Sequence, residues 1–313
     1  MFQTGQQIGL YSLIKKLGRG GFGEVWLAER QTPLLTTKVA VKLPLDKQID
    51  LETVKGEAIL WEQASGHPNV LPIIEANVYD NQILIVSEYV PDGSLEDELK
   101  QQGKLPLERA IEITSGILDG LDFLHSRRII HRDLKPANVL LQGKTPRLAD
   151  FGISRILEST STDYSVNIAG TPPFMSPEAF DGKRNVQTDI WSVGVILYQL
   201  LCGVLPFPQK GASLINAIRT SRPVPLPDSI PQPIKDVVFR ALAKSSSQRY
   251  KSAAIMRDEL QKAKIANPFA QQTTVQISQS EIMEISPDNW GNKPNNRIFK
   301  NLRSLFRSFF EEK

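Results

Sequence analysis

Residues 130–140 read Ile130-His131-Arg132-Asp133-Leu134-Lys135-Pro136-Ala137-Asn138-Val139-Leu140, and residues 148–152 read Leu148-Ala149-Asp150-Phe151-Gly152. Taken singly, each part has a plain explanation, because His131 could be a core histidine and Asp150-Phe151-Gly152 merely a turn. Taken together, two closely spaced blocks of acidic, basic and amide side chains in this order are poorly explained by chance. The ordered set therefore indicates a functional site rather than a purely structural one.

A glycine-rich segment lies near the N-terminus, where Gly18-Arg19-Gly20-Gly21-Phe22-Gly23-Glu24-Val25 joins two predicted strands. Positions without a Cβ let backbone N–H groups approach phosphate oxygens closely. The same glycines also fit a tight turn or a dinucleotide-binding βαβ unit. Residues 25–29 have a strand pattern, whereas the dinucleotide fingerprint opens a helix. The context therefore argues against the dinucleotide unit and leaves a phosphate-covering hairpin or a plain turn.

Lys42 ends the run Val39-Ala40-Val41-Lys42, which has the pattern of a strand with small and branched apolar residues. An ammonium group on such an apolar surface needs an anion nearby. Glu57, near the middle of a helix predicted for residues 51–64, is the natural partner, and Glu52 and Glu62 compete with it. The plain alternative is a solvated lysine on an edge strand.

With these blocks identified, the sequence resembles the eukaryotic-type (Hanks-type) serine/threonine protein kinases. HRDLKPAN resembles the catalytic loop of that family and DFG resembles its metal-binding turn. The resemblance covers residues 11–265 and implies an α+β, two-lobed protein-kinase fold with a β-rich N-lobe and a mainly helical C-lobe. The further matching blocks, in order, are the glycine-rich loop, VAVK at 39–42, HPNV at 67–70, SEYV at 87–90, GTPPFMSPE at 170–178 and DIWSVGV at 189–195.

The resemblance implies transfer of the γ-phosphoryl group of ATP to a protein hydroxyl, with Mg²⁺ or Mn²⁺ as the metal. It implies that Asp133 accepts or orients the proton of the substrate hydroxyl, and that Lys135 neutralises the migrating phosphoryl group. Glu57 would hold Lys42 against the α and β phosphates. The implied metal ligands are Asn138 and Asp150. The glycines implied to cover the phosphates are Gly18, Gly20, Gly21 and Gly23.

The adenine site is implied by the same resemblance. The backbone at Glu88 and Val90 would hydrogen-bond the purine edge, and its two faces would be sandwiched by Val25, Ala40 and Leu140. Ser87 stands just before this connecting strand, where many kinases carry a bulkier side chain. We therefore expect an enlarged back pocket, unless a neighbour such as Trp61 fills it.

Regulation is implied by Arg132, which precedes Asp133. In kinases of this class a phosphate on the activation segment, residues 150–178 here, commonly pairs with that arginine. Autophosphorylation is therefore expected. However, the commonest acceptor position is Asn167 in this chain. The nearest hydroxyls are Ser165 and Thr162, and the alternative is a Ser/Thr-rich loop that is simply solvated.

Two contacts within the C-lobe follow from the resemblance. Thr171 resembles the residue of serine/threonine kinases that contacts the catalytic aspartate and lysine from the substrate side. Glu178 belongs to Ser176-Pro177-Glu178, which replaces the more usual Ala-Pro-Glu, and it remains able to pair with Arg249. Such a buried ion pair would be structural rather than catalytic.

Composition limits the classes of protein that fit. The chain has 313 residues, with 41% hydrophobic and 23% charged residues, and a net charge of only +3. This balance gives no general case for binding nucleic acid. Cys202 is the single cysteine, which fits a reducing compartment, and the first ten residues lack the pattern of a secretory signal, so a cytoplasmic protein is expected. Residues 190–207 are uncharged but contain polar residues, glycine and proline, and we interpret them as a buried helix.

Four regions are predicted: an N-lobe at 1–90, a C-lobe at 91–265, a linker at 266–296 and a basic amphipathic segment at 297–313. This C-terminal segment has an apolar face and several cations, among them Arg297, Lys300, Arg303 and Arg307. A helix here could dock in cis on the small lobe or bind a partner. A membrane surface is the less favoured interpretation.

The sequence therefore predicts a soluble serine/threonine protein kinase that binds ATP and acts on Ser/Thr hydroxyls of protein substrates. The alternative from another class is a pseudokinase scaffold that binds nucleotide and partners without catalysis. Lys42, Asp133, Asn138 and Asp150 are all present, which favours catalysis. A small-molecule phosphotransferase of related fold is a further alternative, and the 170–178 block, which resembles a surface for a protein substrate, argues against it.

Overall fold

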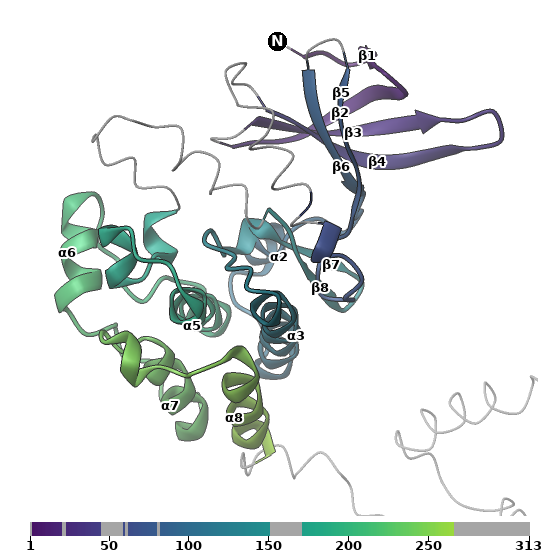
Figure 1. Ribbon diagram of the computed structural model, residues 1–313. Helices are drawn as coiled ribbons and strands as arrows, with labels where there is room; N and C mark the ends of the chain where they lie inside the picture. The colour runs from purple at the N-terminus through teal and green to yellow at the C-terminus, as the bar shows by residue number, and fades with distance from the viewer. Residues whose placement is uncertain are drawn as a thin grey trace, which may run out of the picture. The chain divides into compact units, whose positions relative to one another are not determined.

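The computed structural model describes residues 2–20, 23–44, 59, 62–79, 82–150 and 171–265 (Figure 1). Its N-terminal part is a six-stranded antiparallel sheet in the order β1-β2-β3-β4-β6-β5. The strands are β1 Gln7–Ile8, β2 Tyr11–Gly20, β3 Gly23–Gln31, β4 Thr36–Leu43, β5 Ile73–Tyr79 and β6 Gln82–Glu88.

These strands form in runs rich in β-branched and apolar residues, and successive side chains of a strand point to opposite faces of the sheet. β3, for example, buries Trp26 and Ala28 while the residues between them are partly exposed. The buried face packs a small core of its own, made of Ile8, Tyr11, Leu13, Trp26, Ala28, Val39, Val41, Leu43, Leu84 and Val86. The sequence patterns predict strands at residues 11–17, 25–29, 38–43 and 82–86, and these lie within β2, β3, β4 and β6, whereas β5 was not predicted.

The C-terminal part is mainly helical and carries one short hairpin. Its helices are α2 Leu95–Gln102, α3 Leu107–Ser126, α5 Val186–Cys202, α6 Ala212–Thr220, α7 Gln232–Ala241 and α8 Ala253–Ile265. The hairpin consists of β7 Val139–Gln142 and β8 Thr145–Leu148. The predicted lobe boundary after residue 90 falls between β6 and α2 and stays a prediction.

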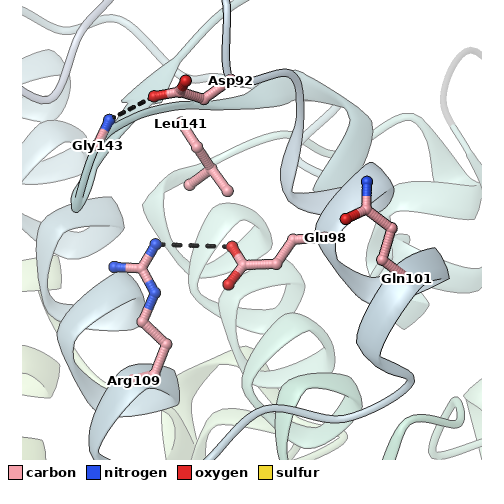
Figure 2. A pocket seen from close by; sticks show the side chains of 6 residues that line it. All are labelled: Asp92, Glu98, Gln101, Arg109, Leu141 and Gly143. Atoms are coloured by element: carbon pink, nitrogen blue, oxygen red, sulfur yellow. Dashed lines mark hydrogen bonds and ion pairs between the residues drawn. The ribbon is translucent and has the colours of Figure 1, made fainter.

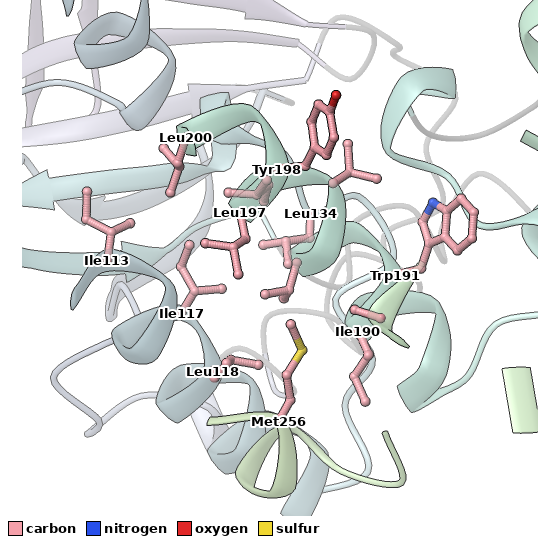
Figure 3. Packing of buried hydrophobic residues seen from close by; sticks show 14 of the residues in the cluster. Ile113, Ile117, Leu118, Leu134, Ile190, Trp191, Leu197, Tyr198, Leu200 and Met256 are labelled. Atoms are coloured by element: carbon pink, nitrogen blue, oxygen red, sulfur yellow. The ribbon is translucent and has the colours of Figure 1, made fainter. Parts of the chain in front are cut away.

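Helix α5 is the centre of the larger core. It is capped at its start by a reciprocal pair of hydrogen bonds between Asn185 and Thr188. Figure 3 shows side chains of α5, such as Ile190 and Leu197, packed with Ile117 of α3 and Met256 of α8. Most side chains of this helix are buried, which explains why apolar residues occur around most of its circumference.

The end of α5 corrects the expected extent of this helix. The uncharged stretch runs to residue 207, but the helix ends at Cys202, because Gly203 takes a left-handed conformation with φ of 74°. A Cβ at Gly203 would also lie 3.0 Å from the Gly103 carbonyl oxygen. None of the helices in the described part of the chain has the length and apolar character that a membrane span requires.

Several predictions fall on residues outside those described. They concern most of the helix at 51–64 with Glu57, the tip of the glycine-rich hairpin with Gly21, the activation segment at 151–170, and the linker and basic segment from 266 onward. These stay predictions.

Candidate active site

The loop that contains Asp133 is held by a buried carboxylate on α5. Asp189, 1% exposed, accepts hydrogen bonds from the backbone N–H of His131 at 2.9 Å and of Arg132 at 3.0 Å. His125 Nε2 lies 2.8 Å from the same carboxylate. Burial alone would raise the pKa of Asp189, but the hydrogen bond with His125 holds it below its ordinary value. An ionised Asp189 therefore fixes the loop backbone.

This fixation matters because Arg132 has a φ of 72°, in the left-handed region that non-glycine residues rarely adopt. Such a conformation costs free energy and persists only where its surroundings impose it. Two hydrogen bonds to Asp189 and the burial of Leu134, 1% exposed, provide that restraint. Figure 3 shows Leu134 among the core side chains of α3 and α5.

Asp133 is surrounded by three of the residues that the sequence singled out. Lys135 Nζ lies 2.7 Å from Asp133 Oδ2. The Asn138 amide donates to the Asp133 carbonyl oxygen at 2.8 Å and to Oδ2 at 3.2 Å. Thr171 donates to Asp133 Oδ1 from its backbone N–H at 3.1 Å and from its hydroxyl at 3.2 Å. The short helical turn Pro136–Asn138 brings Asn138 back toward Asp133.

The Thr171 hydroxyl also accepts a hydrogen bond from Lys135 Nζ at 2.8 Å. The predicted contact of Thr171 with the aspartate and the lysine is therefore confirmed. A single hydroxyl joins the cation and the carboxylate, so these three side chains form a closed polar triangle at the start of the 171–178 segment. The triangle fixes the side-chain rotamers of Asp133 and Lys135.

Lys42 and Asp150 are brought together from the two halves of the fold. Lys42 Nζ donates to Asp150 Oδ1 at 2.8 Å, and Lys42 as a whole is only 8% exposed. Burial would raise the pKa of Asp150, but the charge and hydrogen bond of Lys42 hold it below its ordinary value. Asp150 has a φ of 58°, which is a second strained position in the site.

Backbone hydrogen bonds place Asp150 beside the Asp133 loop. The Ala149 N–H donates to the Asn138 carbonyl oxygen at 2.9 Å, so Asn138 and Asp150 are neighbours across this bond. The Asn138 amide nitrogen is engaged with Asp133, which leaves its side-chain oxygen as the acceptor. The Asp133 loop and the residues after β8 therefore lie side by side.

The glycine-rich residues form the hairpin between β2 and β3. Gly18 pairs with Val25, and Gly20 pairs with Gly23. Gly23 has a φ of 154°, and a Cβ there would lie 2.3 Å from the Leu43 carbonyl oxygen. Glycine is therefore required at Gly23 by close packing against β4, apart from any contact with a ligand.

The residues predicted to line an adenine site lie on β3, β4, β7, the end of β6 and the segment that follows β6. Val25 lies opposite Lys42, and Ala40 lies opposite Ser87, in the sheet. Val90 packs in a small cluster with Leu71, Ala149 and the partly buried Leu140. The structure thus brings together Val90 and Leu140 from segments on either side of α2 and α3.

The end of β6 and the segment that follows it are tied to the β7–β8 hairpin by polar contacts as well. Glu88 forms an ion pair with Arg147 of β8. The Leu141 N–H donates to the Gly93 carbonyl oxygen at 2.9 Å. Ser87 is 8% exposed, and its hydroxyl lies 3.4 Å from the Glu88 carbonyl oxygen. The enlarged back pocket beside Ser87 stays a prediction, because Trp61 lies outside the described residues.

Glu178 and Arg249 form the predicted buried ion pair. Arg249 Nη1 and Nη2 lie 2.6 and 2.9 Å from the two Glu178 carboxylate oxygens. Arg249 is 2% exposed and also donates to the carbonyl oxygens of Ala243, Gln187 and Lys244. Burial opposes ionisation of Glu178, but Arg249 holds the pKa of Glu178 below its ordinary value.

A separate open pocket lies away from these residues (Figure 2). It is lined by Asp92, Glu98, Gln101, Arg109, Leu141 and Gly143. Figure 2 shows Glu98 and Arg109 facing each other, with 3.6 Å between Oε2 and Nη2. None of the site residues predicted from the sequence lines this pocket, so it does not contribute to the candidate site.

A β-rich lobe, a helical lobe, and a Lys–Asp ion pair next to an Asp-Lys-Asn loop define a phosphotransferase fold of the kinase type. Comparison with known families agrees, because the protein kinase domain model matches residues 11–260. The chain therefore belongs to the protein kinase family, in its Hanks-type serine/threonine branch. Members of this family use ATP and a divalent metal and act on proteins.

Relatives of this chain include bacterial and animal proteins. It is 35% identical over 250 residues to the probable serine/threonine-protein kinase PknB of Lactococcus lactis, covering 77% of this chain and 40% of that protein. It is 30% identical over 264 residues to the serine/threonine-protein kinase PrkC of Bacillus subtilis, covering 82% and 40%. It is 32% identical over 249 residues to mouse serine/threonine-protein kinase 36, covering 76% and 18%. The chain thus spans less than half of the length of these relatives.

Proposed function

We propose that this chain is an active kinase that transfers the γ-phosphoryl group of ATP to Ser/Thr hydroxyls of protein substrates, itself included. The observation that carries the proposal is the triangle of Asp133, Lys135 and Thr171. It holds a carboxylate and an ammonium together at the place where a hydroxyl would enter. Phosphoryl transfer needs such positioning and charge neutralisation more than it needs covalent help from the enzyme.

In this proposal ATP lies between the glycine-rich hairpin and the β7–β8 hairpin. Val25 and Ala40 would cover one face of the adenine and Leu140 the other, while the backbone at Glu88 and Val90 would bind its edge. Backbone N–H groups at Gly18, Gly20, Gly21 and Gly23 would approach the phosphates. Lys42 would contact the α and β oxygens, as its buried ammonium requires an anionic neighbour.

The residues that would hold a metal are Asn138 and Asp150. Their amide and carboxylate oxygens suit a hard cation, and Mg²⁺ is usually held by one or two protein side chains together with substrate phosphates. The described residues contain no cluster of three or more His, Cys, Asp or Glu side chains that could hold a metal without such phosphates. When bound, the cation would neutralise charge on the phosphate oxygens.

During transfer Asp133 would orient the substrate hydroxyl and accept its proton, since its carboxylate is held by Thr171 and Asn138. Lys135 would stabilise the negative charge of the migrating phosphoryl group. The hydroxyl of Thr171 would fix the orientation of both groups. This division of roles favours catalysis over the pseudokinase alternative, because every charged position that the reaction needs is present.

The test is to incubate the full chain with labelled ATP, Mg²⁺ or Mn²⁺, and a generic basic protein, and then to map phosphorylated residues. Asp133→Asn should lose at least about 100-fold in rate while still binding nucleotide. The control is Asp119→Asn, because Asp119 pairs with Arg257 at a half-exposed position between α3 and α8. Wild-type protein that binds nucleotide but labels nothing with either metal would support the pseudokinase alternative instead.

The remaining parts of the proposal concern regulation and location. Phosphorylation between residues 159 and 165 would charge the activation segment, and mass spectrometry of active protein would detect it. A cytoplasmic location is proposed because Cys202 is free, which fits a reducing compartment. Docking or partner binding by the basic segment at 297–313 stays a prediction.

A further inference from the structure

Glu24 is a buried carboxylate that the proposed mechanism does not use. It follows Gly23 at the start of β3 and is 2% exposed. It forms an ion pair with Lys16 of β2, and the Trp26 indole N–H donates to its Oε2 at 3.1 Å. Because an unpaired buried charge is costly, the carboxylate strongly favours the arrangement that keeps both donors in place.

The register of the β2–β3 hairpin shows how this arrangement arises. Lys16 lies opposite Trp26, but the pairing then shifts, so that Gly18 lies opposite Val25 and Arg19 opposite Glu24. Leu17 is therefore the extra residue of a β-bulge. Without the bulge, Gly18 rather than Arg19 would face Glu24. The bulge thus places two cations, Lys16 and Arg19, on the face of the sheet that carries the carboxylate.

This face is not the one that would meet ATP. Val25 lies directly opposite Lys42 in the sheet, so these two side chains share a face, and Glu24 and Trp26 lie on the other one. Trp26 belongs to the core of the sheet. The hydrogen bond from Lys16 holds the pKa of Glu24 below its ordinary value, although burial opposes this. Glu24 therefore stays charged while it anchors the hairpin to the core.

We propose that Glu24 is a positioning residue for ATP: with Lys16 and Trp26 it fixes the glycine-rich hairpin from the far face of the sheet. Glycines at 18, 20, 21 and 23 allow close approach to phosphate but leave the backbone with many accessible conformations. An anchor immediately beside Gly23 would reduce this freedom before ATP binds. The inference rests on the proposed function, because it assumes that the hairpin covers phosphates.

The test compares Glu24→Gln with Glu75→Gln in the full chain. Glu75 is also a carboxylate of this sheet and accepts hydrogen bonds from Tyr11 at 2.5 Å, Asn77 at 2.9 Å and Tyr79 at 3.1 Å. Tyr11 is at the opposite end of β2 from Gly20. Glu75→Gln therefore reports the loss of another hydrogen-bonded carboxylate of this sheet, one that makes no hydrogen bond with Lys16 or Trp26 in the described part of the chain.

Glu24→Gln should raise the KM for ATP about tenfold and change kcat less than about twofold, because the anchor acts on binding. A fluorescent ATP analogue with Mg²⁺ should lose affinity to the same extent. Lys16→Met should also raise the KM for ATP, because it removes the cation that pairs with Glu24. Lys16→Arg keeps the cation and should therefore keep the wild-type KM. Glu75→Gln should lower the melting temperature and leave the KM unchanged.

An unchanged KM in both Glu24→Gln and Lys16→Met, or an equal rise in Glu75→Gln, would overturn the inference. If Glu24→Gln does not fold, the comparison of Lys16→Met with Lys16→Arg decides it. The binding measurement keeps this test separate from the proposed function. Wild-type protein that binds the analogue but transfers no phosphate would remove the proposed function and leave the comparison of binding intact.

Discussion

Lys42 and Asp150 form an ion pair of 2.8 Å although they are 108 positions apart in the sequence. Lys42 is near the end of β4, and Asp150 follows β8. The pair therefore joins the β-rich part of the chain to the hairpin beside the loop that contains Asp133. It also brings the groups proposed to contact the phosphates and the metal into one place.

Substitution of either member of this pair should remove activity without unfolding the protein. Asp150→Asn removes an anionic metal ligand, and Lys42→Met removes the phosphate contact, so each should reduce kcat/KM by at least about 100-fold. Lys100→Met is a suitable control, because Lys100 forms only an exposed pair with Glu96 on α2. Retention of more than a tenth of the wild-type activity in Asp150→Asn, measured with labelled ATP, would contradict the proposed role of Asp150.

Thr171 should matter for turnover through its hydroxyl. Thr171→Val keeps the shape but removes the group that donates to Asp133 and accepts from Lys135. The two charged groups would then lose their common partner, and kcat should fall about tenfold. Thr171→Ser keeps the hydroxyl and should stay within about twofold of wild type. Steady-state kinetics at saturating ATP measure both values, and equal losses in the two variants would argue against the hydroxyl.

The loop around Asp133 was predictable because its residues are adjacent in the sequence and ordered in a specific pattern. Four strands were predictable because β-branched and apolar residues are concentrated in short runs between turn residues. Strand β5 was not, since Glu75 and Asn77 interrupt its apolar residues and much of it is exposed. Glu75 is explained by a tertiary contact, in which it accepts a hydrogen bond from Tyr11 of β2, and Asn77 donates in turn to Glu75.

Asp189 shows a second limit of the sequence. It stands at the start of an apolar helix, where an acidic residue is also expected from the helix dipole alone. Its role became visible only when the fold placed it under the backbone of His131 and Arg132. The signal in the sequence that could have revealed Asp189 is a charged residue next to a long stretch of residues that are predicted to be buried. The Glu24 anchor was likewise hidden, because a β-bulge sets which residues face it.

The Glu178–Arg249 pair should be important for stability. Glu178→Gln leaves the fully buried guanidinium of Arg249 without an anion, so the free energy of unfolding should fall by about 3 kcal/mol. Asp119→Asn breaks the half-exposed pair with Arg257 and should cost less than about 1 kcal/mol. Urea unfolding followed by tryptophan fluorescence measures both. Similar small losses in the two variants would show that Arg249 finds other partners.

Stability should fall as the pH falls below 6.5, because of His131. Burial lowers the pKa of this imidazole below its ordinary value of 6.5, although Asp189 and Asp133 favour the charged form. The unfolded chain then binds a proton more readily than the folded chain, so protonation favours unfolding between pH 6.5 and the folded pKa. Burial lowers the pKa of His67 in the same direction. The depressed pKa values of Asp150 and Asp189 also make stability fall as the pH falls, but only below about pH 3.8. They therefore do not affect the window set by His131.

His131→Phe should therefore show a smaller loss of stability than wild type between pH 7 and pH 5. The backbone N–H of residue 131 still donates to Asp189 in this variant, so the loop keeps its anchor. His67→Phe should remove a further part of the pH dependence of stability, because it removes the second imidazole whose pKa is lowered by burial. His67 packs beside Phe123, with ring centroids 4.8 Å apart. Melting temperatures across this pH range provide the measurement. An identical slope in wild type and His131→Phe would mean that the folded protein accommodates a protonated His131, and that the pH response arises elsewhere.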